Sequence, residues 1–358
     1  MTEQRKQLLH DVLKLEKLES IIIFGLPNIR YLTDFTGTDG VFLITEKKSV
    51  FLTDSRYISQ AQNQVSADSV LCYKNKLKAI ADELISSDCK RVGLDAEVVS
   101  VALFQELKSL VGDSLEWCLL NTQLHPLRGV KTRDELVSLK AAANLNFQAF
   151  KTILPMIRPG VTELDVAREL EFSLKRLGGE ANAFDFIVAS GERGALPHGV
   201  ASEKLLQSGE LVTIDFGTKV NGYHSDETVT LAIGEVDRKL RQIFDIVLEA
   251  HDLALEAVRP GFQISDLDAV ARDFITAQGY GDFFGHGLGH GVGLEIHEYP
   301  AVSSRSDQCL VAGMVITIEP GIYIPGTGGV RIEDTIVVTD NGFEKLTSIP
   351  KKFKQLSL

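Results

Sequence analysis

Residues 285–298 read Gly-His-Gly-Leu-Gly-His-Gly-Val-Gly-Leu-Glu-Ile-His-Glu and hold three of the eight histidines of this 358-residue chain. Glycine occupies every second position from Gly285 to Gly293. Successive side chains of an extended backbone point to opposite faces, so one face of this stretch is bare and the other carries His286 and His290. A bare face lets another backbone or a ligand approach closely. The stretch therefore predicts an extended, closely packed segment that presents histidines.

Three other interpretations of this stretch compete with a ligand site. His286 and His290 have the spacing of a helical zinc clamp, but five glycines in nine residues would each cost a helix roughly 1 kcal/mol. A phosphate loop needs a helix after its glycines, whereas residues 294–297, Leu-Glu-Ile-His, favour a strand. Histidines that only satisfy hydrogen bonds in a glycine-rich bend fit the stretch alone as well as a ligand site does.

The C-terminal part of the chain contains an internal duplication. Residues 158–160, Arg-Pro-Gly, return 101 positions later at 259–261. Residues 212–217, Val-Thr-Ile-Asp-Phe-Gly, return 104 positions later as Ile-Thr-Ile-Glu-Pro-Gly. A nearly constant offset indicates two copies of one unit of helices followed by strands. In the first copy, Thr162 and Asp165 form a predicted helix N-cap pair.

Each copy ends with two acidic residues. Asp215 and Asp226 are eleven positions apart, and Glu319 and Glu333 are fourteen apart. The first acid of each pair finishes a short apolar strand before a glycine, and the second is expected in the returning strand. Two strands joined by a turn bring each pair together, and a pseudo-twofold axis would bring the two pairs face to face. Four acids are then expected to share one site.

Such a cluster of carboxylates requires a counter-charge, because each ionised neighbour raises the pKa of the next. Four acids and one histidine are too many ligands for a closed zinc site, but they suit two divalent ions about 3.5–4 Å apart. Oxygen-rich coordination favours Mn²⁺, with Co²⁺, Fe²⁺ or Zn²⁺ also compatible. Taken singly, any of these acids is more often a solvated or hydrogen-bonded carboxylate. The duplication is what favours a metal site.

The composition of the chain limits which partners and which cell compartment we expect. The formal net charge of -12 and the pI near 5.2 disfavour binding to nucleic acid and to anionic membranes. No apolar run is long enough for a signal peptide or a membrane span. The four cysteines are scattered, which suits reduced core thiols in a cytosol. We therefore expect a cytoplasmic protein.

The first third of the chain alternates predicted helices and strands. A helix is expected over residues 2–17, and strands over residues 21–24, 41–45, 50–53 and 91–94, with helices between the later strands. Periodicity lapses near residues 121–130. The expected domains are residues 1–125 and 126–358.

Several motifs together resemble the pita-bread metallopeptidases, the family of methionyl aminopeptidase, prolidase and aminopeptidase P. They are Ile214-Asp215-Phe216-Gly217, Ser225-Asp226, Gly289-His290-Gly291-Val292-Gly293, Ile318-Glu319-Pro320-Gly321 and Arg331-Ile332-Glu333-Asp334. Residues 28–37 and 51–57 are similar to the creatinase/prolidase N-terminal domain. The resemblance implies an α/β protein with such an N-terminal α/β domain and a C-terminal duplicated pita-bread α+β domain.

The resemblance also assigns the metal ligands. Asp215 would bind one ion, His290 and Glu319 the other, and Asp226 and Glu333 would bridge both. A metal-bridging hydroxide would be the nucleophile, with Glu319 as general base. All five positions are present, whereas creatinase, which is similar in fold, lacks these ligands.

Further site residues follow from the resemblance. His198 and His297 match two histidines that hold the scissile carbonyl and stabilise the oxyanion, although a Pro-His-Gly loop is by default a surface loop. His286 matches an additional active-site histidine of the aminopeptidase P branch, with core packing as the alternative. Arg331 is expected to orient the acids or to be an ordinary strand arginine. The family often has arginine where this chain has Val229, which leaves charge near the site and fine specificity open.

The resemblance implies an exopeptidase that hydrolyses the bond between an N-terminal residue and proline. Proline lacks the N–H that an extended hydrogen-bonded substrate uses, so a dedicated pocket must recognise its ring. The substrate is a dipeptide or a longer peptide with proline second, and the sequence leaves this choice open. A homodimer is expected. The alternatives are a catalytically silent binding or scaffold protein of the same fold and a creatinase-like amidinohydrolase.

Overall fold

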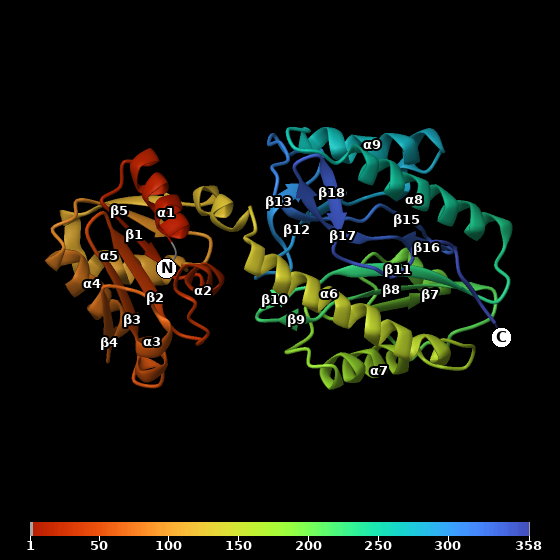
Figure 1. The fold of residues 1–358 in the computed structure, drawn as a ribbon, viewed down its shortest axis with the longest axis horizontal. Coiled ribbons are helices and arrows are strands. Elements are labelled where there is room, and N and C mark those ends of the chain that lie inside the picture. The colour runs from red at the N-terminus through yellow and green to blue at the C-terminus, as the bar shows by residue number, and fades with distance from the viewer. Residues whose placement is uncertain (1–2, 358) are drawn as a thin grey trace. The chain divides into compact units, whose positions relative to one another are not determined.

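The computed structural model describes residues 3–357 and divides the chain into two compact units, residues 1–128 and 129–358 (Figure 1). Each unit has its own sheets and apolar core. None of the helices in the described part of the chain is long and apolar enough to span a bilayer.

The first unit is built on one mixed sheet of six strands in the order β4-β3-β2-β1-β5-β6. Its strands are β1 (Ser20–Ile23), β2 (Val41–Thr45), β3 (Ser49–Thr53), β4 (Ser69–Cys72), β5 (Arg91–Asp95) and β6 (Glu116–Leu120). Its helices are α1 (Glu3–Leu15), α2 (Leu26–Thr33), α3 (Ile58–Gln64), α4 (Lys76–Ser86) and α5 (Val101–Val111), and the short helix η2 (Thr122–Arg128) ends the unit. The central strand β1 pairs antiparallel with β2 and parallel with β5.

The apolar runs of this unit form the strands they predicted, each within one residue of the expected ends. These strands are buried along most of their length because helices such as α4 and α5 cover their apolar side chains. The helix expected over residues 2–17 is α1; residue 2 lies outside the described residues. The unit also contains β4 and β6, which the sequence did not predict because these outer strands are partly exposed.

The prediction that the cysteines lie in the core is wrong for two of them. Cys72 and Cys309 are exposed, Cys118 is partly buried, and only Cys89 is fully buried. All four thiols are free.

The second unit contains two antiparallel-rich sheets, each covered by a pair of helices (Figure 1). One sheet has the order β19-β11-β8-β7 and the other β13-β12-β14-β17-β18. The helices are α6 (Arg133–Ile153), α7 (Glu163–Arg176), α8 (Arg238–Ala257) and α9 (Ile264–Ala277). The strands of the first sheet are β7 (Ile187–Ser190), β8 (Glu210–Phe216), β11 (Glu227–Ile233) and β19 (Gln355–Leu356). Those of the second are β12 (Gly289–Gly291), β13 (Glu298–Val302), β14 (Val315–Ile318), β17 (Asp334–Thr339) and β18 (Gly342–Lys345).

Two small hairpins complete the second unit. They are β9 (Lys219–Val220) with β10 (Tyr223–His224), and β15 (Gly321–Ile324) with β16 (Gly328–Arg331). The order of two helices followed by antiparallel strands occurs twice, which confirms the duplication predicted from the repeated segments.

Helix α7 begins at the cap that the sequence predicted. The Thr162 side chain accepts a hydrogen bond from the Asp165 amide, and the Asp165 carboxylate accepts one from the Thr162 amide. Thr132 and Glu135 make the same reciprocal pair at the start of α6. Such pairs satisfy amides that a helix start otherwise leaves without partners.

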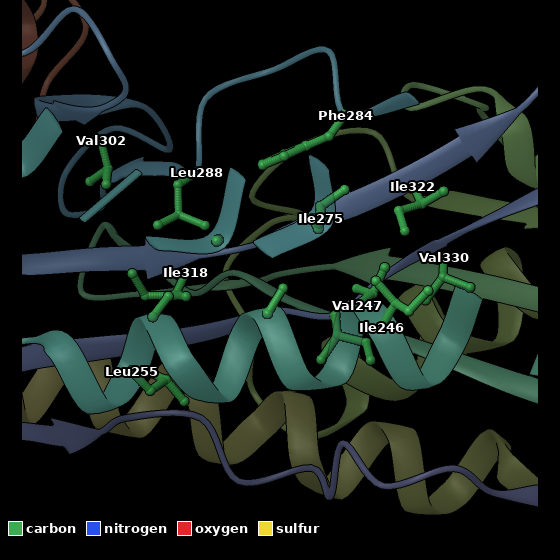
Figure 2. Close-up of a cluster of buried hydrophobic side chains, with 14 of the residues drawn as sticks. Ile246, Val247, Leu255, Ile275, Phe284, Leu288, Val302, Ile318, Ile322 and Val330 are labelled. Carbon is green, nitrogen blue, oxygen red and sulfur yellow. The ribbon is translucent and has the colours of Figure 1, made fainter. Parts of the chain in front are cut away.

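Two apolar cores hold the helix pairs against the sheets. One core joins α6 and α7 to β8 and β11, and the other joins α8 and α9 to the strands around β14 and β17. Figure 2 shows the second core, in which Val247 and Leu255 of α8 lie near Leu288, Ile318 and Val330. Leu288 comes from the glycine-rich stretch, so that stretch is anchored in this core while its histidines stay outside it.

Candidate metal centre

Three carboxylates from the two copies of the duplication meet in the second unit. Oxygen atoms of Asp215, Asp226 and Glu333 all lie within 4.8 Å of one another, and all three residues are buried. Asp215 lies on β8, Asp226 immediately precedes β11, and Glu333 immediately precedes β17. The expectation that the second acid of each pair lies inside a strand is therefore wrong by one residue, because the regular pairing of each strand begins after that acid.

Hydrogen bonds between the two copies hold these acids together. The Thr228 hydroxyl donates to Glu333 Oε2 over 2.7 Å, and the Thr335 hydroxyl donates to the Asp226 carbonyl oxygen over 2.7 Å. The Glu333 amide donates to the Thr228 carbonyl oxygen over 3.2 Å. Backbone and side-chain bonds therefore both contribute to the spacing of the two acids.

His290 and Glu319 complete the cluster. His290 Nε2 lies 3.3 Å from Glu319 Oε1 and 3.6 Å from Asp226 Oδ2. The other ring nitrogen, Nδ1, lies 3.0 Å from the Gly291 carbonyl oxygen, which can accept its proton. A proton on Nδ1 would leave the Nε2 lone pair facing the carboxylates. The structure thus brings together the five residues that the resemblance assigned as ligands.

The alternating glycines allow the histidine strand to lie between two neighbours. β12 pairs with β13 on one side and with β14 on the other. A Cβ atom at Gly289 would lie 2.1 Å from the Thr317 carbonyl oxygen, and one at Gly291 would lie 2.3 Å from the Tyr299 carbonyl oxygen. The prediction of a close backbone approach is confirmed. The strand expected over residues 294–297 is wrong, since these residues form a bend before β13.

The electrostatics of the cluster suit bound cations. Burial, followed by repulsion from neighbouring acids, raises the pKa of Asp226 and Glu333 well above the usual carboxyl value, and burial also raises that of Glu319. Asp215 Oδ1 and Glu333 Oε1 are buried and have no hydrogen-bond partner in the described chain. Buried oxygens without a donor are costly unless a cation compensates them. The donor set therefore fits divalent metal ions.

Arg331 is the buried cation beside the cluster. Its Nη2 donates to Asp215 Oδ2 over 2.6 Å, and its Nη1 donates to the Tyr323 hydroxyl and to the Pro197 carbonyl oxygen. Burial works against its charge, but Tyr323 and Asp215 outweigh that effect and raise its pKa. Arg331 thus fixes one oxygen of Asp215 and leaves the other facing the cluster.

Three further histidines line the same cavity. His286 Nε2 lies 2.8 Å from the Tyr323 hydroxyl, and burial lowers the pKa of His286. The His297 ring stands edge-on to the His290 ring with 4.2 Å between centroids, and burial lowers its pKa too. His198 is exposed on the loop after β7. The cavity has a volume of about 400 Å³, and all five residues of the cluster line it.

The cavity also has an apolar wall that the sequence did not reveal. Phe184, Ile187, Val200 and Ile296 line it, together with Tyr323. These residues come from separate loops and strands and share no motif, so only the folded chain identifies them.

The loop that carries His198 is held by one buried acid. Glu163, at the start of α7, accepts hydrogen bonds from the amide and hydroxyl of both Ser190 and Ser202 and from Arg193 Nε. Five donors to one carboxylate fix both ends of residues 190–202.

Val229, which stands where the family often has arginine, is 2% exposed and packs in the core beneath α6 and α7. Its side chain therefore faces away from the cavity, because strand side chains alternate and its neighbour Thr228 faces the cluster.

Comparisons with known proteins agree with this geometry. Residues 137–340 match Metallopeptidase family M24, and residues 5–130 match the Creatinase/Prolidase N-terminal domain. An Xaa-Pro dipeptidase from Pyrococcus furiosus is 37% identical over 94% of this chain and 95% of its own length. The structure of an Xaa-Pro dipeptidase from Bacillus anthracis matches with a TM-score of 0.95 and 41% identity over 99% of both chains. That of an X-Pro aminopeptidase from Thermotoga maritima matches with a TM-score of 0.87 and 36% identity over 97% of this chain and 100% of its own. The duplicated fold and its buried cluster of acids and histidine agree with the family match over residues 137–340, and this chain belongs to metallopeptidase family M24.

Proposed function

We propose that this protein is a two-metal exopeptidase that hydrolyses the bond between an N-terminal residue and proline. The observation that carries the proposal is the buried cluster in which Asp215, Asp226 and Glu333 approach within 4.8 Å and His290 Nε2 lies 3.3 Å from Glu319. The names of the relatives, Xaa-Pro dipeptidase and X-Pro aminopeptidase, supply the substrate class. Residues 126–358 are the catalytic domain and residues 1–125 the accessory domain in this proposal.

The five clustered residues, Asp215, Asp226, His290, Glu319 and Glu333, would hold the ions. When bound, two divalent ions lower the pKa of a water molecule and polarise the scissile carbonyl. Mn²⁺ is the proposed ion because four of the five donors are carboxylates.

Protein groups around the ions have separate roles. Glu319, whose pKa burial raises, is positioned to accept a proton from the attacking water. His198 and His297 donate hydrogen bonds to the carbonyl oxygen as it gains charge. His286 and Arg331 keep their partners in place: His286 contacts Tyr323, and Arg331 holds Asp215.

The apolar wall of the cavity recognises the proline ring. A pyrrolidine ring offers no N–H donor, so its binding depends on shape and apolar contact. Phe184, Ile187 and Ile296 give such a surface in the same cavity as the clustered acids.

The function is tested by comparing substrates after removal and return of metal. Protein dialysed against chelator and then against Mn²⁺ is given Ala-Pro, a pentapeptide with proline second, and a Met-first peptide without proline. We expect cleavage of a proline substrate only after Mn²⁺ is returned, and no cleavage of the third peptide. Protein that binds two ions per chain and cleaves none of the proline substrates would refute the proposal. A chain that binds no divalent ions and gains no activity with Mn²⁺ would instead be a binding or scaffold protein, and turnover of creatine without metal would indicate an amidinohydrolase.

We also propose a cytoplasmic homodimer. Sedimentation equilibrium of the full chain tests the dimer directly, with a mass near twice 39.3 kDa as the expected result.

A further inference from the structure

A single lysine near the C-terminal end of the chain lies between two buried acids. Lys351 is 5% exposed in its side chain, and its Nζ lies 2.7 Å from Glu227 Oε1 and 3.6 Å from Asp334 Oδ1. Both acids are almost completely buried. Burying a lysine beside two carboxylates is favourable only when their geometry is closely fixed.

The two acids hold corresponding positions in the duplication. Glu227 directly follows Asp226, and Asp334 directly follows Glu333. Successive side chains point to opposite sides of an extended backbone. Each copy therefore turns one acid toward the carboxylate cluster and the next acid away from it, and Lys351 contacts both of the acids that face away.

The segment around Lys351 makes further bonds to the same two acids. The Ile349 amide donates to Glu227 Oε1 over 2.9 Å, and the Thr347 hydroxyl donates to Asp334 Oδ1 over 2.7 Å. Other groups facing Asp334 are Lys345 Nζ at 2.5 Å and His251 Nε2 at 3.3 Å. Lys345 is 40% exposed, so Lys351 is the buried cation that joins the two copies at this point.

We propose that Lys351 is a positioning residue for the metal centre: by holding Glu227 and Asp334 together, it sets the separation of the neighbouring carboxylates Asp226 and Glu333. The inference rests on the proposed function, because it takes these two acids as ligands of the metal ions. Groups that orient metal ligands from behind typically change metal affinity about 10–100-fold when they are removed.

The direction of the change separates positioning from simple electrostatics. Lys351 and the bound cations are both positive, so removing the lysine charge relieves repulsion. If this electrostatic effect acted alone, the affinity for Mn²⁺ should rise. Loss of positioning lowers it. The double variant Glu227→Gln/Lys351→Met removes one charge of each sign, so any loss of affinity in it reports geometry and not net charge.

The experiment measures the dissociation constant of Mn²⁺ alone by calorimetric titration of the metal-free full chain, at a temperature where each variant is folded. We expect binding at least about tenfold weaker in Lys351→Met and in the double variant. Lys352→Met is the matched control, because Lys352 is the adjacent residue and is exposed, and its affinity should equal that of the wild type. Melting temperatures of the metal-free proteins are recorded alongside.

Each outcome decides one claim. Wild-type affinity or tighter binding in the double variant overturns the role of Lys351, even if the melting temperature falls, because a merely structural lysine changes stability and not the metal site. If Lys351→Met does not fold, the double variant decides, since it leaves no uncompensated charge at this pair. Failure of the wild type to bind Mn²⁺ would overturn the proposed function itself, and this inference with it.

Discussion

Replacing Gly289 with alanine should displace the histidine strand. A Cβ atom there would lie 2.1 Å from the Thr317 carbonyl oxygen and 2.7 Å from the Thr317 hydroxyl oxygen. The carbonyl contact is about 1 Å inside the distance at which such atoms normally touch. The carbonyl belongs to β14, a central strand that pairs with β17, so we expect β12 to move by about 1 Å and to carry His290 with it. Overpacking of this kind costs about 1–3 kcal/mol of stability.

A shift of about 1 Å at a catalytic site reduces turnover about 100-fold. The assay is kcat for a proline-second peptide at saturating Mn²⁺, with the dissociation constant of Mn²⁺ measured in parallel. Gly285→Ala is the control, because it is the same substitution four residues earlier, where a Cβ atom meets nothing within 4 Å. We expect the control to keep wild-type activity. Equal activity of Gly289→Ala and the wild type would refute the claim that the close approach positions His290.

Three other changes test separate parts of the site. Glu163→Gln places an NH₂ group against the five donors that bond to Glu163. We expect the free energy of unfolding, measured in denaturant, to fall by about 2 kcal/mol and kcat to fall as well. Unchanged stability would contradict the role of this acid. His198→Ala should lower kcat about 100-fold and leave Mn²⁺ affinity unchanged, so a loss of affinity would mark His198 as a ligand. Because the pKa values of Asp226, Glu319 and Glu333 are raised, these acids hold protons to higher pH and must release them to bind metal. Mn²⁺ binding should therefore keep tightening as the pH rises above the ordinary carboxyl pKa of about 4, and it should release protons. Titrations in buffers of different ionisation enthalpy measure both effects, and pH-independent affinity without proton release would contradict the raised pKa values.

The sequence predicted the features that follow from repeated segments and residue spacing. The offset between repeated segments gave the two copies of the second unit, and the spacing of Asp215, Asp226, Glu319 and Glu333 gave a common site, because strand ends and turns restrict where such acids can lie. The alternating glycines gave the close strand packing around His290, since only a bare face permits it.

The rest depends on contacts between distant parts of the chain. The apolar wall that includes Phe184 and Ile296 is assembled from separate loops. The five bonds to Glu163 and the two ion pairs of Lys351 join residues far apart in sequence. The exposed cysteines were missed for a related reason: burial of a small apolar residue depends on what covers its strand or loop, and local sequence does not contain that information.

The paired acids have a consequence for how strand β17 is aligned. A slip by one residue would replace Glu333 with Asp334, one carboxylate for another, so charge alone does little to reject the wrong register. Both faces of β17 are buried, but only Ile336 and Val338 belong to the apolar core under α8 and α9. A slip would replace them there with Thr335 and Val337, so this core rejects the wrong register. The alignment of the metal ligands thus depends on apolar side chains that lie outside the carboxylate cluster. Mutations of these side chains should misplace the ligands before they unfold the protein.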